Sequence, residues 1–210
     1  MIPIYLIWIF FPSLGLILFL VYSAWHFGQT DFENWNIKMP FFSLLWGVTI
    51  LIFLFASHPY EFNYILDLIN IKPIDQIYDL HKWAYFILIW PLLMALIFRK
   101  TEWLLLILFF VLSQNLGLLV AFGLYFIFHH SVKGWFNLKE QIKMSHYKMY
   151  INALPFNVGA LVLYILIFSN SDLEFESNAA WFFVFLSCIS FPHVICMNLF
   201  YRKKSESSIS

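Results

Sequence analysis

Long apolar stretches separated by short polar segments dominate the pattern of hydrophobic and polar positions along this chain. These apolar runs occupy residues 2–26, 41–57, 83–98, 103–128, 150–168 and 179–201. A helix that crosses the hydrocarbon core of a bilayer needs about 20 predominantly apolar residues. The pattern therefore predicts an all-α bundle of transmembrane helices.

The number of transmembrane segments depends on how the run 103–128 is divided. It contains the consecutive polar residues Ser113, Gln114 and Asn115, followed by Gly117. Adjacent polar residues are poorly placed against lipid, so a turn at this point is favoured over one long tilted helix. The chain then has seven segments. Without the break it has six.

Prolines and charged residues mark other boundaries. Pro12 interrupts the first run, Pro40 suits a helix start, and Pro91 is expected to kink the run 83–98. Residues 58–82 mix apolar and charged positions and are expected to lie along the membrane interface. Residues 133–148 are rich in lysine and are predicted to form a polar loop.

The composition supports a membrane location. The chain has 210 residues, of which 62% are hydrophobic and 11% charged. Such a low charged fraction is atypical of a soluble domain of this length. We expect one transmembrane domain over residues 1–201 and a short polar tail over residues 202–210, with the first run retained because no cleavage-site pattern follows it. A net charge of zero indicates no nucleic-acid partner.

The distribution of charge predicts the orientation. Lysines cluster in residues 133–148, and Arg202 begins a basic segment near the C-terminus, whereas residues 172–176 between the last two runs are acidic. Positive residues are enriched in cytoplasmic loops. We therefore expect a multi-pass protein of the plasma membrane with a cytoplasmic C-terminus, and, if the chain has seven segments, an external N-terminus.

The ionisable groups near the apolar runs are nearly all histidines. His26 and His58 end the first and second runs, His129 and His130 follow the fourth, and His193 lies inside the last. A membrane histidine can be a hydrogen-bonded packing residue, but neutral imidazole also binds iron, copper, nickel and zinc. With no thiolate or carboxylate in the group, the pattern favours an all-histidine metal site.

Two acidic residues are candidates to orient these ligands. Glu61 follows His58 by three residues and would reach its ring on one helical turn. Asp31 follows His26 by five residues and is less well placed.

The aromatic content of 22%, including 26 Phe, has two interpretations. Aromatic side chains can face lipid and anchor a protein at the membrane interface. They can also line a pocket for a long apolar ligand. Trp25, Tyr125 and Phe126 are the candidates for such a lining because they are close to the histidines in sequence.

Several membrane histidine or pigment proteins fit less well. No lysine lies inside an apolar run, so a retinal Schiff base is not expected. Membrane di-iron desaturases carry clustered histidine boxes, whereas this chain has seven histidines and one adjacent pair. A haem held by two histidines stays open, because it requires only two of these residues.

Three short motifs together resemble a known family. They are His26-Phe27-Gly28 followed by Asp31, Tyr125-Phe126 followed by His130-Ser131, and Pro192-His193. Their order and spacing resemble the Brp/Blh family of bacterial and archaeal membrane β-carotene 15,15'-dioxygenases. The resemblance extends over most of the chain.

The resemblance implies Fe(II) bound by His26, His58 and His130, with a carotenoid and dioxygen as substrates and retinal as the product. The family has a further histidine where this chain has Gly134, so His193 or His129 would complete the site. We predict His193, because His129 points roughly 100° away from His130 on the same helix. The alternative function is a non-enzymatic membrane protein or subunit that binds carotenoid or haem.

The chain order leaves one question open. His26 and His58 end successive runs, so two complete spans would place them on opposite faces of the membrane. A shared metal site would require a short or broken segment near Pro12 or Pro59.

Overall fold

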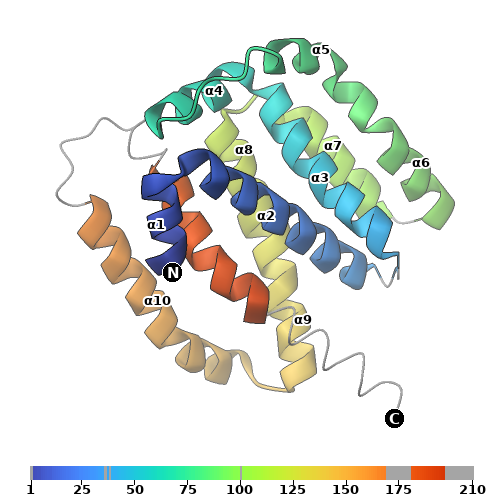
Figure 1. Ribbon diagram of the computed structural model, residues 1–210. Helices are drawn as coiled ribbons and strands as arrows, with labels where there is room; N and C mark the ends of the chain where they lie inside the picture. Colours follow the sequence, from blue (N-terminus) through green and yellow to red (C-terminus); the bar gives the residue numbers. More distant parts are fainter. Residues whose placement is uncertain (1, 36, 38, 100, 169–180, 197–210) are drawn as a thin grey trace.

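The described part of the chain is helical and contains no strand. The computed structural model describes residues 2–35, 37, 39–99, 101–168 and 181–196. The helices are α1 (Ile2–Phe10), α2 (Pro12–Asn34), α3 (Pro40–Ser57), α4 (Pro59–Leu68), α5 (Ile77–Ile87), α6 (Ile89–Phe98), α7 (Thr101–Ser113), α8 (Leu118–Leu124), the π-helix η1 (Tyr125–Ser131), α9 (Val132–Ile142) and α10 (His146–Phe168). A last helix, Trp181–Cys196, is drawn in red in Figure 1. The predicted all-α class is confirmed for these residues.

Several helix boundaries lie where the sequence predicts them. Pro12, Pro40 and Pro59 occupy the first turns of α2, α3 and α4, where a missing backbone N–H costs nothing. The run 103–128 breaks between Ser113 and Leu118, as expected from its polar residues. The run 83–98 is divided at Leu88, three residues before Pro91. Pro91 cannot donate the hydrogen bond that would continue α5 into α6.

The lysine-rich segment is not the loop that the sequence predicted. Residues 132–142 form α9, and α8, η1 and α9 follow one another without a break from Leu118 to Ile142. The sequence VKGWFNLKEQI is strongly amphipathic, and its apolar residues Val132, Trp135 and Phe136 recur with helical spacing. His129 and His130 therefore lie within a continuous helical stretch, not at its end.

The closest helix packing is between α2 and α3, which run side by side in Figure 1. A Cβ added at Gly28 would lie 1.8 Å from the carbonyl oxygen of Ser43, and one added at Gly47 would lie 1.8 Å from that of Ala24. The two backbones are thus in direct contact at a pair of small-xxx-small motifs. This contact fixes the position of the α2 face that carries His26.

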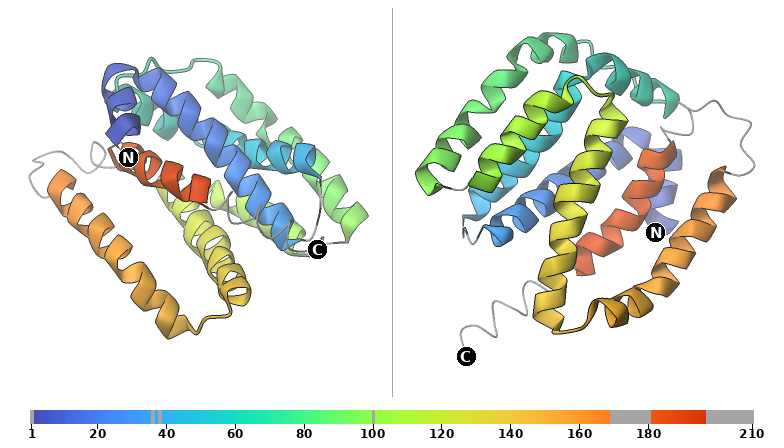
Figure 2. Two further views of the ribbon diagram at one scale, coloured as in Figure 1. Left: turned by 60° about the horizontal axis from the view of Figure 1, so that its bottom comes forward. Right: turned by 180° about the vertical axis from the view of Figure 1, so that it is seen from behind.

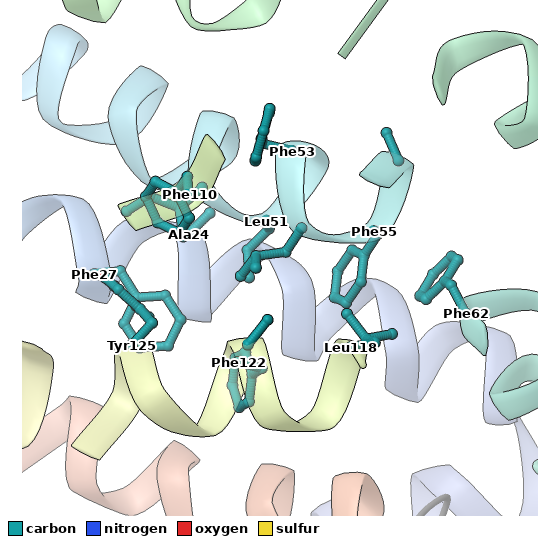
Figure 3. Packing of buried hydrophobic residues seen from close by; sticks show 14 of the residues in the cluster. Ala24, Phe27, Leu51, Phe53, Phe55, Phe62, Phe110, Leu118, Phe122 and Tyr125 are labelled. Carbon is teal, nitrogen blue, oxygen red and sulfur yellow. The ribbon is translucent and has the colours of Figure 1, made fainter. Parts of the chain in front are cut away.

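The core is aromatic and lies between α2, α3, α7 and α8. Figure 3 shows Phe27, Phe110, Phe122 and Tyr125 filling the space between these helices. Beside them, Trp46 and Trp103 are fully buried, with ring centroids 5.4 Å apart. Several core residues therefore come from the same turns that carry the histidines.

The membrane-spanning count predicted from the sequence is not confirmed. Among the described residues, Pro40–Ser57 is the helix that combines sufficient length with a mean hydropathy of 2.0. Shorter apolar helices are Ala84–Phe98, Thr101–Ser113 and Trp181–Cys196. The expected tail at residues 202–210 lies outside the described residues.

Candidate metal centre

Three histidines from distant parts of the chain meet beside α2. His26 comes from α2, His130 from η1 and His193 from the last helix. Each ring can offer one nitrogen such that the three nitrogens lie within 4.8 Å of one another. The ring centroid of His26 lies 4.9 Å from that of His130 and 5.2 Å from that of His193. The last helix packs against α2 and α8, with the rings of Tyr22 and Phe191 5.4 Å apart and those of Phe122 and Phe183 5.8 Å apart; its course beside α8 and η1 can be followed in the right-hand view of Figure 2.

Two of the three imidazoles are buried without hydrogen-bond partners. His26 is 4% exposed and His130 is 6% exposed, whereas His193 is exposed. Both ring nitrogens of His26 and Nδ1 of His130 lack a partner. Buried polar atoms are normally paired, and leaving them unpaired costs about 1–3 kcal/mol each. Unpaired nitrogens that converge on one point are what a metal site requires.

The spacing of the nitrogens fits one divalent transition-metal ion. Two imidazole nitrogens at about 2.1 Å from one ion are at most about 4.2 Å apart. The observed limit of 4.8 Å exceeds this slightly, so small ring rotations would close the site. Three imidazoles suit iron, copper, nickel or zinc and leave further coordination positions open. The exposed edge of His193 marks the accessible side.

Aromatic rings surround the buried side of the trio. Phe126 stacks on His130 with centroids 5.5 Å apart, and Phe27 meets the same ring edge-on at 4.9 Å. Phe126 was predicted to line the site of a long apolar ligand; it packs against His130, and its role in binding such a ligand stays a prediction. These rings replace water around His26 and His130 with apolar surface, which strengthens any electrostatic interaction inside the site.

His58 is not brought to this trio. Its Nδ1 lies 2.8 Å from the carbonyl oxygen of Leu54, and its Nε2 lies 2.8 Å from that of Leu116. The physical reason is the antiparallel contact of α2 and α3 near Gly47: His58 follows Gly47 by roughly 16 Å along the helix axis. No break in either helix brings His26 and His58 together. His26 and His58 therefore do not share one metal site in this structure.

Glu61 also has a different neighbour from the one predicted. Its Oε2 accepts a hydrogen bond of 2.6 Å from the backbone N–H of Leu118, at the first turn of α8. A carboxylate is favourable there because the first N–H groups of a helix lack partners within the helix. His58 and Glu61 thus join the end of α3 to the turn before α8, each through its own backbone partner.

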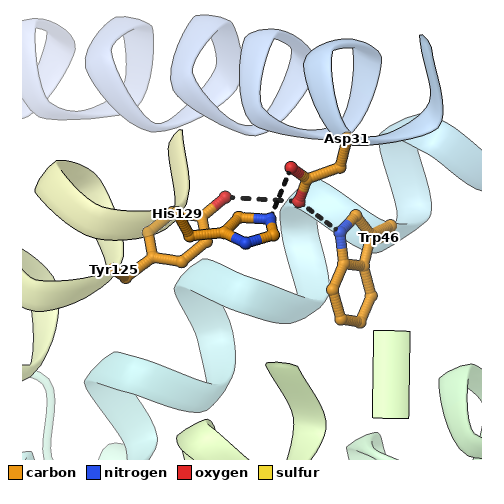
Figure 4. Close-up of polar contacts among 4 residues, drawn as sticks. All are labelled: Asp31, Trp46, Tyr125 and His129. Carbon is orange, nitrogen blue, oxygen red and sulfur yellow. Dashed lines mark hydrogen bonds and ion pairs between the residues drawn. The ribbon is translucent and has the colours of Figure 1, made fainter. Parts of the chain in front are cut away.

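Asp31 contacts His129 and not His26. Figure 4 shows the fully buried carboxylate of Asp31 between α2, α3 and η1. It accepts hydrogen bonds of 2.9 Å from His129 Nε2 and 2.9 Å from Trp46 Nε1, and the hydroxyl of Tyr125 lies 3.5 Å away. Sequence reasoning missed this network because Asp31 and His129 are far apart in the chain.

The other predicted lining residues differ in position. Tyr125 is buried in the core, with its ring 5.6 Å from that of Phe110. Trp25 is 50% exposed, and its Nε1 donates to the side chain of Gln29 on the outside of α2. Trp25 therefore points away from the histidines, because it lies roughly 100° around the helix from His26.

Thr30 and Gly134 each lie one helical turn after a histidine of the trio. Thr30 lies one turn after His26, is 2% exposed, and its hydroxyl has no partner. Its position at i+4 from His26 was the sequence signal that could have identified it. Gly134 lies one turn after His130, and a Cβ added there would meet nothing within 4 Å. A Cβ is therefore accommodated at that position.

The fold and this site define a helical protein with a largely buried centre of three histidines suited to a transition metal. The comparison with protein families agrees with this class: the β-carotene 15,15'-dioxygenase family matches residues 1–201. The chain belongs to this family. No curated protein and no solved structure shows significant similarity to it.

Proposed function

We propose that this chain is a membrane dioxygenase that cleaves β-carotene, or a related carotenoid, at its central 15,15' double bond. The products would be two retinal molecules, each carrying one oxygen atom of dioxygen. The observation that carries the proposal is the convergence of His26, His130 and His193, with unpaired buried nitrogens, in a chain of this family.

The three imidazoles would hold Fe(II), and the iron would supply the redox chemistry with dioxygen. His26 and His130 are buried and anchored by packing, so they would fix the position of the ion. Phe27 and Phe126 would exclude water from the buried side of the site. An apolar polyene would approach from the lipid toward the exposed side of His193 and be positioned with one double bond beside the site.

A haem held by two axial histidines fits this arrangement poorly. In such a haem the two ligand nitrogens lie on opposite sides of a flat macrocycle. Here a third imidazole offers a nitrogen within 4.8 Å of both others, so the three nitrogens would converge on one ion. The trio therefore favours non-haem iron over the haem-binding alternative.

We also propose that residues 1–201 are embedded in the plasma membrane with the C-terminus in the cytoplasm. Large apolar side chains on the surface support this, including Phe41 at 71% and Phe156 at 79% exposure. Monomeric soluble proteins rarely expose extended apolar surface of this kind.

The proposal is tested by iron content and retinal formation together. The chain is expressed in β-carotene-producing cells, and both quantities are compared for the unmodified protein, His26→Ala and His130→Ala. Both substitutions should remove most of the iron and most of the retinal. His146→Ala is the matched control, because His146 contacts Trp135 and Lys139 and is not part of the trio. Unchanged iron in both ligand variants would refute the site.

A further inference from the structure

The sequence does not show which of two adjacent histidines on η1 joins His26 and His193. His129 and His130 are chemically equivalent as metal ligands. Adjacent residues on a helix point in different directions, so a rotation of η1 about its axis by one residue's angular step would exchange them. Something in the fold must therefore determine which of the two imidazoles joins His26 and His193.

The side chains of η1 form two neighbouring rows. Tyr125 stacks on His129 with centroids 5.5 Å apart and planes inclined by 24°. Phe126 stacks on His130 with centroids 5.5 Å apart and planes inclined by 26°. The two rows are nearly equivalent in their internal packing. Packing within η1 alone therefore does not favour one orientation.

The two rows differ in what they meet on α2. The row of His130 faces His26, whereas the row of His129 faces the carboxylate of Asp31. Asp31 is completely buried, and His129 Nε2 and Trp46 Nε1 are its two donors at 2.9 Å. Rotation of η1 would withdraw both His129 and Tyr125, which lie in one row, and leave this buried carboxylate with Trp46 as its remaining donor, which is strongly unfavourable.

We propose that Asp31 is a positioning residue that selects the metal ligand: by holding His129, it directs His130 into the trio. Because this role requires the metal centre proposed above, it rests on that proposed function. Among the described residues, the hydrogen bonds of Asp31 go to His129, Trp46 and Tyr125 and not to the trio, so it acts through the rotation of η1. A buried polar pair that fixes the register of a helix is the best-attested use of such pairs.

The test measures Co(II) affinity and the Co(II) absorption bands of the purified full chain in detergent. In the unmodified background, His130→Ala should weaken Co(II) binding by more than the roughly 10–100-fold of an outer-shell change. In an Asp31→Leu background, the same substitution should weaken binding by less than about 10-fold, because His129 is released to replace the lost ligand. Asp31→Leu alone should show two sets of Co(II) bands where the unmodified protein shows one.

Two further variants identify the replacing ligand. Adding His129→Phe to the Asp31→Leu, His130→Ala protein keeps an aromatic ring on Tyr125 but removes the imidazole, so binding should be lost. Trp46→Phe removes the indole donor to Asp31 and keeps the contacts with His129 and Tyr125. In this control background His130→Ala should cost as much as in the unmodified protein.

The outcomes separate this inference from the proposed function. An equal loss on His130→Ala with and without Asp31 would overturn the selection by Asp31 and leave the metal centre intact. No Co(II) binding by the unmodified protein would overturn both. If Asp31→Leu does not fold, Asp31→Asn is used instead because it preserves the shape of the side chain. In the Asp31→Asn background, His130→Ala should weaken Co(II) binding by an intermediate factor. A loss as large as in the unmodified background would then overturn the inference.

Discussion

Individual histidines in this chain differ mainly in what their ring nitrogens meet. The nitrogens of His26 are buried and unpaired, whereas those of His58 each lie 2.8 Å from a backbone carbonyl. A ring already engaged on both sides stabilises a turn, and a ring with free lone pairs is available to a metal. Burial alone does not separate the two roles, because both residues are buried.

This difference predicts opposite effects for two alanine substitutions. His58→Ala removes contacts that join α3 to the turn before α8, so it should lower the free energy of unfolding by about 1–3 kcal/mol. Iron bound per folded protein should stay unchanged. His26→Ala should remove the iron but lower the free energy of unfolding by less than His58→Ala does. Thermal unfolding in detergent and iron analysis of the same samples measure both quantities. Loss of iron in folded His58→Ala protein would return His58 to the ligand set.

A second residue-level prediction concerns His193. His193→Ala should abolish iron binding, because two imidazoles hold the ion weakly, whereas His129→Ala should have a milder effect. Gly134→His should partly restore binding in the His193→Ala protein, because position 134 lies one turn after His130 and accommodates a Cβ. Iron stoichiometry and retinal yield are the measurements. Full activity of His193→Ala would identify His193 as a packing residue.

At the residue scale, the sequence pointed to the candidate metal ligands but not to the groups that each of them contacts. His26, His130 and His193 could be named because imidazole near an apolar run is unusual. The contact between Asp31 and His129 could not, because it joins positions 98 residues apart and depends on the rotation of η1. His58 looked equivalent to His26 because the sequence does not show which carbonyl groups a ring will meet.

Helix packing determines whether the histidines can meet at all. The backbones of α2 and α3 touch at Gly28 and Gly47, and this contact sets the depth and rotation of His26. Prolines at helix starts and the polar residues near Ser113 made several boundaries predictable. The α9 helix was mistaken for a loop because its lysines were read as loop composition, although its apolar residues recur with helical spacing. The amphipathic period was the better signal.

The α2–α3 contact predicts a large effect from a small substitution. Gly28→Ala would place a methyl group 1.8 Å from the carbonyl oxygen of Ser43, so the helices must separate. We expect a loss of about 1–3 kcal/mol in the free energy of unfolding, as for other overpacked cores, together with weaker iron binding. Gly123→Ala is the matched control, because a Cβ there meets nothing within 4 Å. The control should stabilise α8 by about 0.5–1 kcal/mol. Equal stability of the two variants would contradict the close contact.

At the scale of the whole molecule, apolar surface is the dominant feature. Phe10, Phe128 and Phe156 are each more than two-thirds exposed, and most of the described side chains of α10 are exposed as well. Several helices are too short to cross a bilayer alone, so the number of spans does not follow from the apolar runs, and the membrane environment stays a prediction. Breaks at Leu88 and before α8 divide apolar runs that look continuous in the sequence.

The orientation of the molecule gives the last prediction. Residues 133–148 are rich in lysine and residues 172–176 are acidic, so the positive-inside rule places the first segment in the cytoplasm and the second outside. Single cysteines are introduced at Lys143 and Glu174 after replacement of Cys188 and Cys196 by alanine. In intact cells, a membrane-impermeant thiol reagent should label position 174 and spare position 143. After permeabilisation it should label both. Labelling of position 143 alone in intact cells would reverse the orientation and place the C-terminal end of α9 toward the outside.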